Sequence, residues 1–269
     1  MTSGRPEVPT TTVPLHSPDF YAGNPYPAYA ELRHSTPVVW NETTEFWALL
    51  KYEDVRYVSG HPLLFSSTKG ITIPDPSEPE PIQEGNLIFT DPPRHRQLRK
   101  LINSGFTRRQ VTLLEPKVRQ IVKGIVDEVD PSRPYQFAEE IASPLPTRMI
   151  AELLGAPPDD WEQFRTWSDA AVGGSDPDIE MDPLVAMTEL YEYFMKLIEI
   201  RRSGGAGDHD DLLAILAAAE VDGERLTDED LLNFSFLLLV AGNETTRNLI
   251  ALGTLALIEH PDQFALLRA

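Results

Sequence analysis

The sequence contains no cysteine among its 269 residues. Disulfide bonds and thiolate metal sites built from these residues are therefore excluded. No apolar run approaches the roughly 18 residues that a membrane-spanning helix needs. The first residues, MTSGRPEV, lack the apolar core of a secretory signal. We therefore expect a soluble, cytoplasmic protein.

Positive charge is also scarce. The chain has 23 Lys and Arg residues against 42 Asp and Glu residues, a formal net charge of -19. Such an excess of negative charge disfavours binding to nucleic acid or anionic lipid. One stretch departs from this balance, because residues 91–109 hold six Lys or Arg residues and one acid. This basic stretch is either a docking site for an acidic partner or a solvated helix face.

Proline, with 24 residues, is frequent and divides the first third of the chain into short elements. Residues 1–18 are rich in Pro, Ser and Thr, which predicts a mobile tail. Residues 38–40 and 46–50 are rich in β-branched and aromatic side chains and predict a hairpin. Short helices are expected at residues 25–35 and 52–59. The proline-rich run 66–86 predicts a long irregular loop, a common place for binding residues.

The remainder of the chain has helical periodicity. Asp91, followed by two prolines, resembles the start of a helix with an acidic N-cap. Further helices are predicted at residues 111–129, 145–154, 161–172 and 184–202 and after the cap Asp210-Asp211. The fold class is therefore mainly α with a small N-terminal β-sheet, and we expect one domain over residues 19–269.

The longest predicted helix begins at Thr227 with a capping-box-like sequence and runs to His260, where Pro261 ends the pattern. It is apolar on most sides, which predicts a buried central helix. Six consecutive polar residues at 243–248 interrupt it. Because they cover every side of a helix, some of them must face the interior, and Glu244 or Thr245 is the expected one.

Two chemical interpretations of these polar residues remain open. Ala241 and Gly242 are small enough to let a flat or bulky group approach, and a threonine hydroxyl bonded one turn back can widen or bend a helix. A hydroxyl and a carboxyl beside a cavity would suit proton delivery. Alternatively, the residues form an interdomain polar patch in which Glu244 is paired with an arginine.

The sequence Ala-Gly-Asn-Glu-Thr-Thr at 241–246 resembles the oxygen-binding motif of the long I helix of cytochromes P450, the haem-thiolate monooxygenases. The resemblance implies that Glu244 and Thr245 deliver protons during oxygen activation. It also implies that Ala241, Gly242 and Thr246 lie against haem b. Most members of the family carry Asp where this chain has Glu244.

A second motif supports the same family. Residues 91–99, DPPRHRQLR, resemble the signature of the P450 C helix, in which His95 and Arg99 would bind the haem propionates. Two such side chains four residues apart lie on one face of a helix. The resemblance also places Ile88 and Phe106 near the haem and places Leu87, Val240 and Ala241 at the substrate pocket, which would be completed by the 66–89 loop and helices around 161–200.

The family further implies an electron donor of the ferredoxin type. In P450s such donors dock at the C-helix face, which makes five basic side chains candidates for this contact: Arg94, Arg96, Lys100, Arg108 and Arg109. The substrate would be an apolar small molecule, and the similarity to actinobacterial members suggests a steroid-like or lipid-like one.

The family's thiolate cysteine follows the I helix by many residues, and the printed chain ends at Ala269. We therefore expect the printed chain to be an incomplete P450 domain that lacks thiolate ligation and activity, and to be unstable because residues 231–258 lack packing partners. The alternative is a non-catalytic relic or a helical haem- or lipid-binding module. A di-iron site would need two Glu-x-x-His motifs, and only Glu31 to His34 fits. Residues 208–211 (DHDD) could bind a cation or simply cap a helix.

Overall fold

The computed structural model describes residues 8–71, 73, 85–173, 181–204, 210–221 and 223–269. Within these residues the fold is mainly helical with two small antiparallel sheets. The chain divides into two compact units, residues 1–96 and 97–269, and the division falls inside one helix, α4 (Arg94–Asn103). The predicted single domain over 19–269 therefore stays a prediction.

The first unit is built around the predicted hairpin. Strands β1 (Val38–Asn41) and β2 (Phe46–Leu49) pair antiparallel, with Trp40 opposite Trp47. The hairpin is accompanied by three helices and a 3-10 turn: α1 (Pro18–Ala22), α2 (Tyr26–Ser35), α3 (Tyr52–Gly60) and η1 (Leu87–Phe89). Leu15, Leu32 and Val39 form its small buried core.

Residues 9–17 differ from the predicted mobile tail. The Trp40 amide donates to the Pro9 carbonyl at 2.9 Å, and Thr10 forms a parallel bridge with Trp40. Leu15 is only 3% exposed, and its carbonyl accepts a hydrogen bond from the Tyr21 hydroxyl at 2.7 Å. The segment is ordered because Leu15 is buried and because its backbone pairs with the edge of β1. Composition does not predict either contact. Residues 1–7 and most of the predicted loop 66–86 lie outside the described residues.

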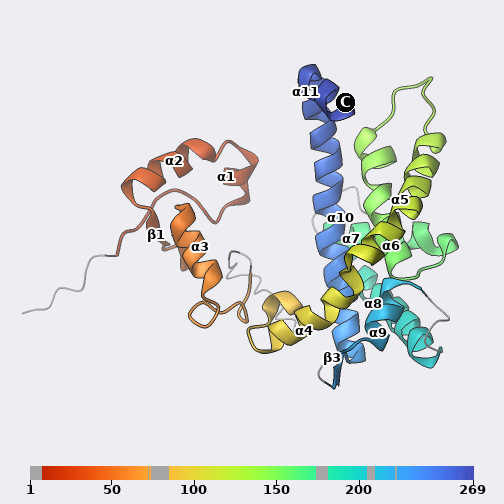
Figure 1. Cartoon of the computed structure of the whole chain (residues 1–269). Coiled ribbons are helices and arrows are strands. Elements are labelled where there is room, and N and C mark those ends of the chain that lie inside the picture. The colour runs from red at the N-terminus through yellow and green to blue at the C-terminus, as the bar shows by residue number, and fades with distance from the viewer. Residues whose placement is uncertain (1–7, 72, 74–84, 174–180, 205–209, 222) are drawn as a thin grey trace, which may run out of the picture. The chain divides into compact units, whose positions relative to one another are not determined.

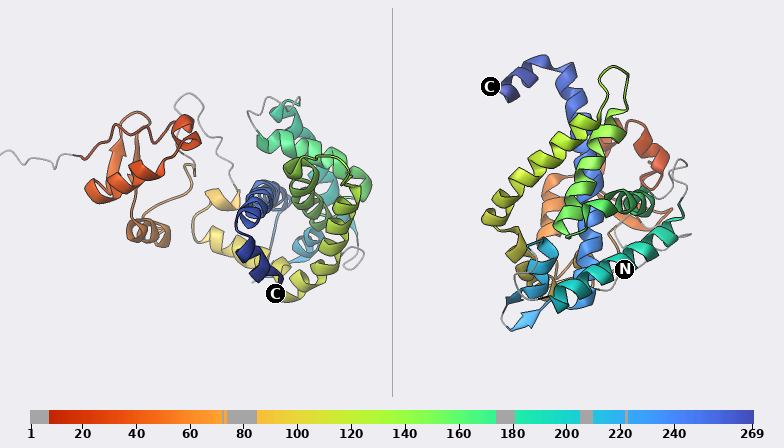
Figure 2. Two further views of the ribbon diagram at one scale, coloured as in Figure 1. Left: turned by 90° about the horizontal axis from the view of Figure 1, so that it is seen from above. Right: turned by 90° about the vertical axis from the view of Figure 1, so that its right-hand side faces the viewer.

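The second unit consists of helices packed around α10 (Asp228–Glu259), the long helix that Figure 1 draws in blue. Figure 2, seen from above, shows α10 nearly end-on with helices of this unit gathered on one side. Its other α-helices are α5 (Arg108–Glu128), α6 (Pro144–Leu153), α7 (Trp161–Gly173), α8 (Pro183–Ser203), α9 (Leu212–Ala218) and α11 (Pro261–Arg268). Its shorter elements are η2 (Ser104–Phe106), the π turn η3 (Ala138–Ala142), η4 (Pro158–Asp160) and the strands β3 (Glu220–Val221) and β4 (Glu224–Arg225).

Several helix starts follow the predicted capping chemistry. The Thr227 hydroxyl accepts from the Asp230 amide at 3.0 Å, while the Asp230 carboxylate accepts from the Thr227 amide at 2.9 Å. This confirms the capping box at the start of α10. Asp211 caps α9 through the Ala214 amide at 2.8 Å, as expected. Residues 208 and 209 of the possible cation site lie outside the described residues.

Burial of α10 changes along its length. From Asp230 to Phe236 every residue is buried, and Leu239 is fully buried. Beyond this point one face is open, and it exposes four large apolar side chains: Leu249, Leu252, Leu255 and Ile258. The prediction of a buried central helix is therefore correct for the first half, while in the second half α6, α7 and η3 cover only one side. No helix in the described part of the chain is long and apolar enough to cross a membrane.

A buried ion pair joins three elements of the second unit. The Arg201 guanidinium on α8 donates from Nε to the Asp211 carboxylate at 2.8 Å and from Nη2 to the Gly155 carbonyl at 2.9 Å. The two charged side chains are 5% and 10% exposed. Gly155 has φ +73°, and a Cβ there would lie 2.0 Å from Arg201 Nη2. A glycine is therefore required both for the backbone and for the close approach of the arginine.

Removing one partner of this pair should destabilise the protein strongly. We expect Arg201→Gln to lower the free energy of unfolding by about 3–5 kcal/mol, because it leaves Asp211 buried without a counter-charge. The matched control is Arg119→Gln, which breaks an exposed pair with Glu115 on α5 and should cost less than about 0.5 kcal/mol. Urea unfolding followed by circular dichroism measures both. Equal losses in the two variants would contradict this account.

Candidate active site

The polar residues 243–248 lie on opposite faces of α10. Asn243 is the buried one, 5% exposed, whereas Glu244 and Thr245 are exposed. The prediction that Glu244 or Thr245 faces the interior is therefore wrong. The Asn243 amide oxygen accepts from the hydroxyl of Thr147 on α6 at 3.3 Å, so an amide rather than a carboxylate meets the neighbouring helix. An amide carries no charge, which makes its burial much less costly.

Thr245 is held by its own helix. Its hydroxyl donates to the Ala241 carbonyl at 2.8 Å, the bond to the preceding turn that the sequence predicts. The expected widening of the helix is absent, because α10 is regular α-helix from Asp228 to Glu259. The proton of the Thr245 hydroxyl is engaged on the helix, while its lone pairs remain available on the open face.

Glu244 lies one turn from Arg247, and the closest distance between their charged atoms is 4.0 Å. The two side chains are 55% and 38% exposed. An exposed pair at this distance contributes little to stability and leaves the carboxylate free to make other contacts. The pair lies within one helix, so it does not form the interdomain patch considered as the alternative.

The small residues before Glu244 have different surroundings. Ala241 and Val240 are exposed on the open face of α10. Gly242 faces α6, where a Cβ would lie 3.1 Å from the Ile150 Cδ1 atom. Thr246 is half-buried. The structure therefore places Ala241, Glu244 and Thr245 on an open face and gives Gly242 a role in helix packing.

His95 and Arg99 lie four residues apart on α4, with His95 half-buried and Arg99 exposed. The helix begins at Arg94, and its first backbone bond runs from the His95 amide to the Asp91 carbonyl at 3.1 Å. The Asp91 carboxylate does not cap the helix as expected. It accepts from the Ser67 amide at 3.1 Å, and hydrogen bonds from the Ser66 side chain and this amide lower its pKa.

Three predicted apolar positions differ in exposure. In the first unit Leu87 is buried and Ile88 is 37% exposed, and the Asn86 side chain fixes their turn by accepting from the Ile88 amide at 3.2 Å. In the second unit Phe106 is 41% exposed and contacts Phe234 of α10 edge-on, with ring centroids 6.3 Å apart. Phe106 therefore links η2 to α10.

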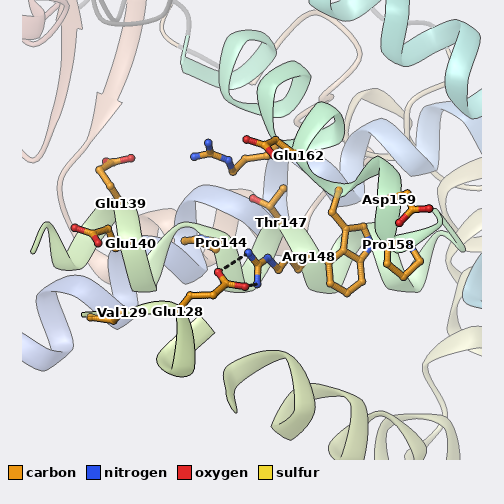
Figure 3. Close-up of a pocket in the computed structure, with 12 residues that line it drawn as sticks. Glu128, Val129, Glu139, Glu140, Pro144, Thr147, Arg148, Pro158, Asp159 and Glu162 are labelled. Carbon is orange, nitrogen blue, oxygen red and sulfur yellow. Dashed lines mark hydrogen bonds and ion pairs between the residues drawn. The ribbon is translucent and has the colours of Figure 1, made fainter. Parts of the chain in front are cut away.

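A cavity of about 700 Å³ lies among the end of α5, η3, α6, η4 and the start of α7 (Figure 3), and Thr147 is part of its lining. The Arg148 guanidinium makes two hydrogen bonds to Glu128, at 3.0 and 3.2 Å, and lies 6.0 Å from the Trp161 ring centroid. The sequence does not reveal this cavity, because its lining comes from five elements. Five carboxylates line it: Glu128, Glu139, Glu140, Asp159 and Glu162.

The described residues contain no group of three or more His, Asp or Glu side chains that could hold a metal ion. The pair Glu31 and His34 lies exposed on α2, and the His34 ring contacts its own helix at the Ala30 carbonyl. The open face of α10 and the two side chains of α4 therefore remain the candidate site that the sequence predicts.

No protein-family model matches the sequence. Among curated proteins, the chain is 42% identical to the cytochrome P450 monooxygenase PikC of Streptomyces venezuelae over 93% of this chain and 60% of that protein. It is 37% identical to a methyl-branched lipid omega-hydroxylase of Mycobacterium bovis, over 96% of this chain and 64% of that protein. The chain thus spans somewhat over half the length of these relatives.

Solved structures lead to the same result. A Mycobacterium marinum cytochrome P450 in complex with pseudoionone is 34% identical to this chain. It superposes with a TM-score of 0.80, and the match covers 98% of this chain and 68% of that one. These comparisons agree with the resemblance noted in the sequence at residues 241–246 on α10 and at His95 and Arg99 on α4. The chain therefore belongs to the cytochrome P450 family.

Proposed function

We propose that the protein is a haem-dependent monooxygenase that inserts one oxygen atom from dioxygen into a C–H bond of an apolar, methyl-branched or steroid-like substrate. The observation that carries this proposal is the open face of α10, which presents the Thr245 hydroxyl and the Glu244 carboxylate beside Ala241. The similarity to a methyl-branched lipid omega-hydroxylase supports the substrate class.

The residues present fit haem b. The small, exposed side chain of Ala241 and the exposed apolar Val240 and Leu249 leave room for a flat apolar group against α10. His95 and Arg99 on α4 would hold the propionates through charge-assisted hydrogen bonds. When bound, haem with a cysteine thiolate ligand supplies the activation of dioxygen. The 269 residues contain no cysteine, so that ligand is not among them.

Thr245 and Glu244 would have different roles in proton transfer. Because the Thr245 hydroxyl donates to the Ala241 carbonyl at 2.8 Å, its lone pairs can accept a hydrogen bond from a water or a substrate-derived group on the open face. The exposed Glu244 carboxylate can exchange protons with solvent. Thr245 would therefore fix a water at the reacting atoms, and Glu244 would resupply the proton that this water loses.

The basic stretch would receive the electron donor. The protein carries a net charge of -19, so an acidic ferredoxin is repelled by most of its surface. Arg96, Lys100, Arg108 and Arg109 are exposed, and Arg94 is half-buried. A local excess of positive charge on an acidic protein steers an acidic partner to one face.

A haem- or lipid-binding module without catalysis is the second candidate function. The observation behind it is the row of exposed apolar side chains on α10, among them Leu249, Leu252 and Leu255, which would suit bound haem or lipid without any reaction. Such a module would bind haem or lipid but would not consume dioxygen, and this difference separates it from the monooxygenase.

Replacing the propionate-binding side chains should weaken haem binding. We expect Arg99→Gln to raise the Kd for haemin by about tenfold or more, the size expected for losing a hydrogen bond between charged groups. Titration of the protein with haemin, followed by visible absorbance, measures this Kd. Arg119→Gln on α5 is the control for loss of one exposed positive charge and should leave the Kd unchanged. A Kd that does not respond to Arg99→Gln would exclude Arg99 from the haem site.

Removing the Thr245 hydroxyl should uncouple oxygen consumption from product formation. In the haem-loaded protein supplied with an electron donor and pristanic acid, we expect Thr245→Val to lower product per dioxygen on the order of 10²-fold, as expected for loss of positioned proton transfer. Valine keeps the shape of threonine, and Thr245→Ser restores a hydroxyl and should recover most of the product. Gas electrodes and mass spectrometry give the ratio. Equal ratios in the valine variant and the wild type would remove Thr245 from the mechanism.

Reversing charge in the basic stretch should slow reduction. We expect Arg108→Glu combined with Arg109→Glu to lower the rate of reduction by a reduced ferredoxin by about tenfold and to flatten its dependence on salt. The control combines Arg119→Glu with Lys123→Glu, which changes the net charge equally on the same helix. Stopped-flow absorbance measures both rates. Similar slowing in the two double variants would attribute the effect to overall charge.

A further inference from the structure

The contact between α6 and α10 contains a buried polar pair. Thr147 is 1% exposed and Asn243 is 5% exposed, and their side-chain oxygens lie 3.3 Å apart. The Thr147 hydroxyl also lies 3.2 Å from the Ser143 carbonyl on its own helix. The hydroxyl has one proton, which the Ser143 carbonyl and the Asn243 amide oxygen share, so this proton joins the Asn243 side chain to the backbone of α6.

The backbones of the two helices approach closely at the same point. A Cβ on Gly242 would lie 3.1 Å from Ile150 Cδ1, and Ile150 is itself 4% exposed. Thr147 and Ile150 are three residues apart and so share one face of α6. This face therefore contacts two consecutive residues of α10, one through close van der Waals packing and the other through a hydrogen bond.

Asn243 and Thr245 lie on nearly opposite sides of α10. Two residues correspond to a rotation of about 200° around a helix axis. Ala241 is two residues before Asn243 and is joined to Thr245 by the hydroxyl bond of 2.8 Å, so both lie on the open face. Any roll of α10 about its axis that moves Asn243 away from Thr147 must also turn the Thr245 hydroxyl.

We propose that Thr147 and Asn243 form a positioning pair that fixes the rotation of α10 and thereby the direction of the Thr245 hydroxyl. A purely apolar contact tolerates sliding and rotation, because dispersion and burial are not directional. A buried amide tolerates neither, because its polar atoms lose their partner when the helix rolls. A single buried asparagine sets the register of paired helices in coiled coils in the same way. That this orientation serves oxygen activation rests on the proposed function.

The absence of cysteine allows a direct test of the rotation. Two single-cysteine reporters are Ala241→Cys on the open face and Thr246→Cys on the half-buried side, and each carries the only thiol among these 269 residues. Their rates of reaction with 5,5′-dithiobis(2-nitrobenzoic acid) are measured alone and after adding Thr147→Val, which removes only the hydroxyl. We expect the two rates to change in opposite directions, which changes their ratio by about two- to tenfold, the factor that corresponds to one neutral hydrogen bond.

The direction of the two changes separates positioning from simple stabilisation. If the pair only stabilises the fold, loss of the hydroxyl increases opening of the helix, and both thiols react faster. That result, or no change in either rate, would overturn the proposal. Thr147→Ser keeps the hydroxyl and should leave the ratio unchanged. Asn243→Leu removes the amide from the other side of the contact and should reproduce the opposite shifts.

The thiol rates need no haem, so they test the positioning pair independently of the monooxygenase activity. If the rates shift in opposite directions and the haem-loaded wild type forms no product, the positioning pair stands and the proposed function fails. If both hold, Thr147→Val should also lower product per dioxygen, and Thr147→Ser should restore it. Normal product per dioxygen in a variant whose thiol rates have shifted would show that the Thr245 direction does not serve the reaction.

Discussion

The structure depends on the one-sided packing of α10. Its first half, from Asp230 to Leu239, is buried among neighbouring helices, whereas beyond Leu239 one face contacts α6 and the opposite face is open. Under the proposed function this asymmetry matters, because the residues that pack α10 against its neighbour and those proposed to contact a ligand alternate along the same few turns. Gly242 and Asn243 belong to the packed face, and Ala241, Glu244 and Thr245 belong to the open one.

The positively charged side chains also divide into buried ones that stabilise the fold and exposed ones on the surface. The net charge is -19, and the few arginines fall into two groups. Arg201 is buried and binds Asp211 and the Gly155 carbonyl, whereas the arginines of residues 91–109 are mostly exposed. His95 is half-buried and Arg99 is exposed, and both lie on one side of α4. The helix itself packs through Leu98, Leu101 and Ile102. In the proposed function, this helix contacts a cofactor and an electron donor through neighbouring side chains.

Local patterns predicted much of the fold. The hairpin at 38–50, the capping box at Thr227 and the limits of α8 and α10 follow from neighbouring residues. The site itself stays a prediction, and the sequence did not reveal which of its side chains face the neighbouring helix. Six polar residues cover all sides of a helix, so only the location of α6 decides that Asn243 is buried and Thr245 is open. The Asp91 carboxylate likewise bonds to Ser67, 24 residues away, and residues 9–17 are held by β1. Contacts between distant segments leave no periodic signal in the sequence.

The origin of the inserted oxygen atom tests the central claim most directly. The protein, as its gene encodes it, is loaded with haem, supplied with a reduced ferredoxin and incubated under ¹⁸O₂ with pristanic acid or testosterone. Mass spectrometry then measures label in the product. A monooxygenase with the proposed open site on α10 predicts one ¹⁸O atom in each hydroxylated product and none from solvent. Tight binding of haem and substrate with no labelled product would contradict the monooxygenase and leave a binding module.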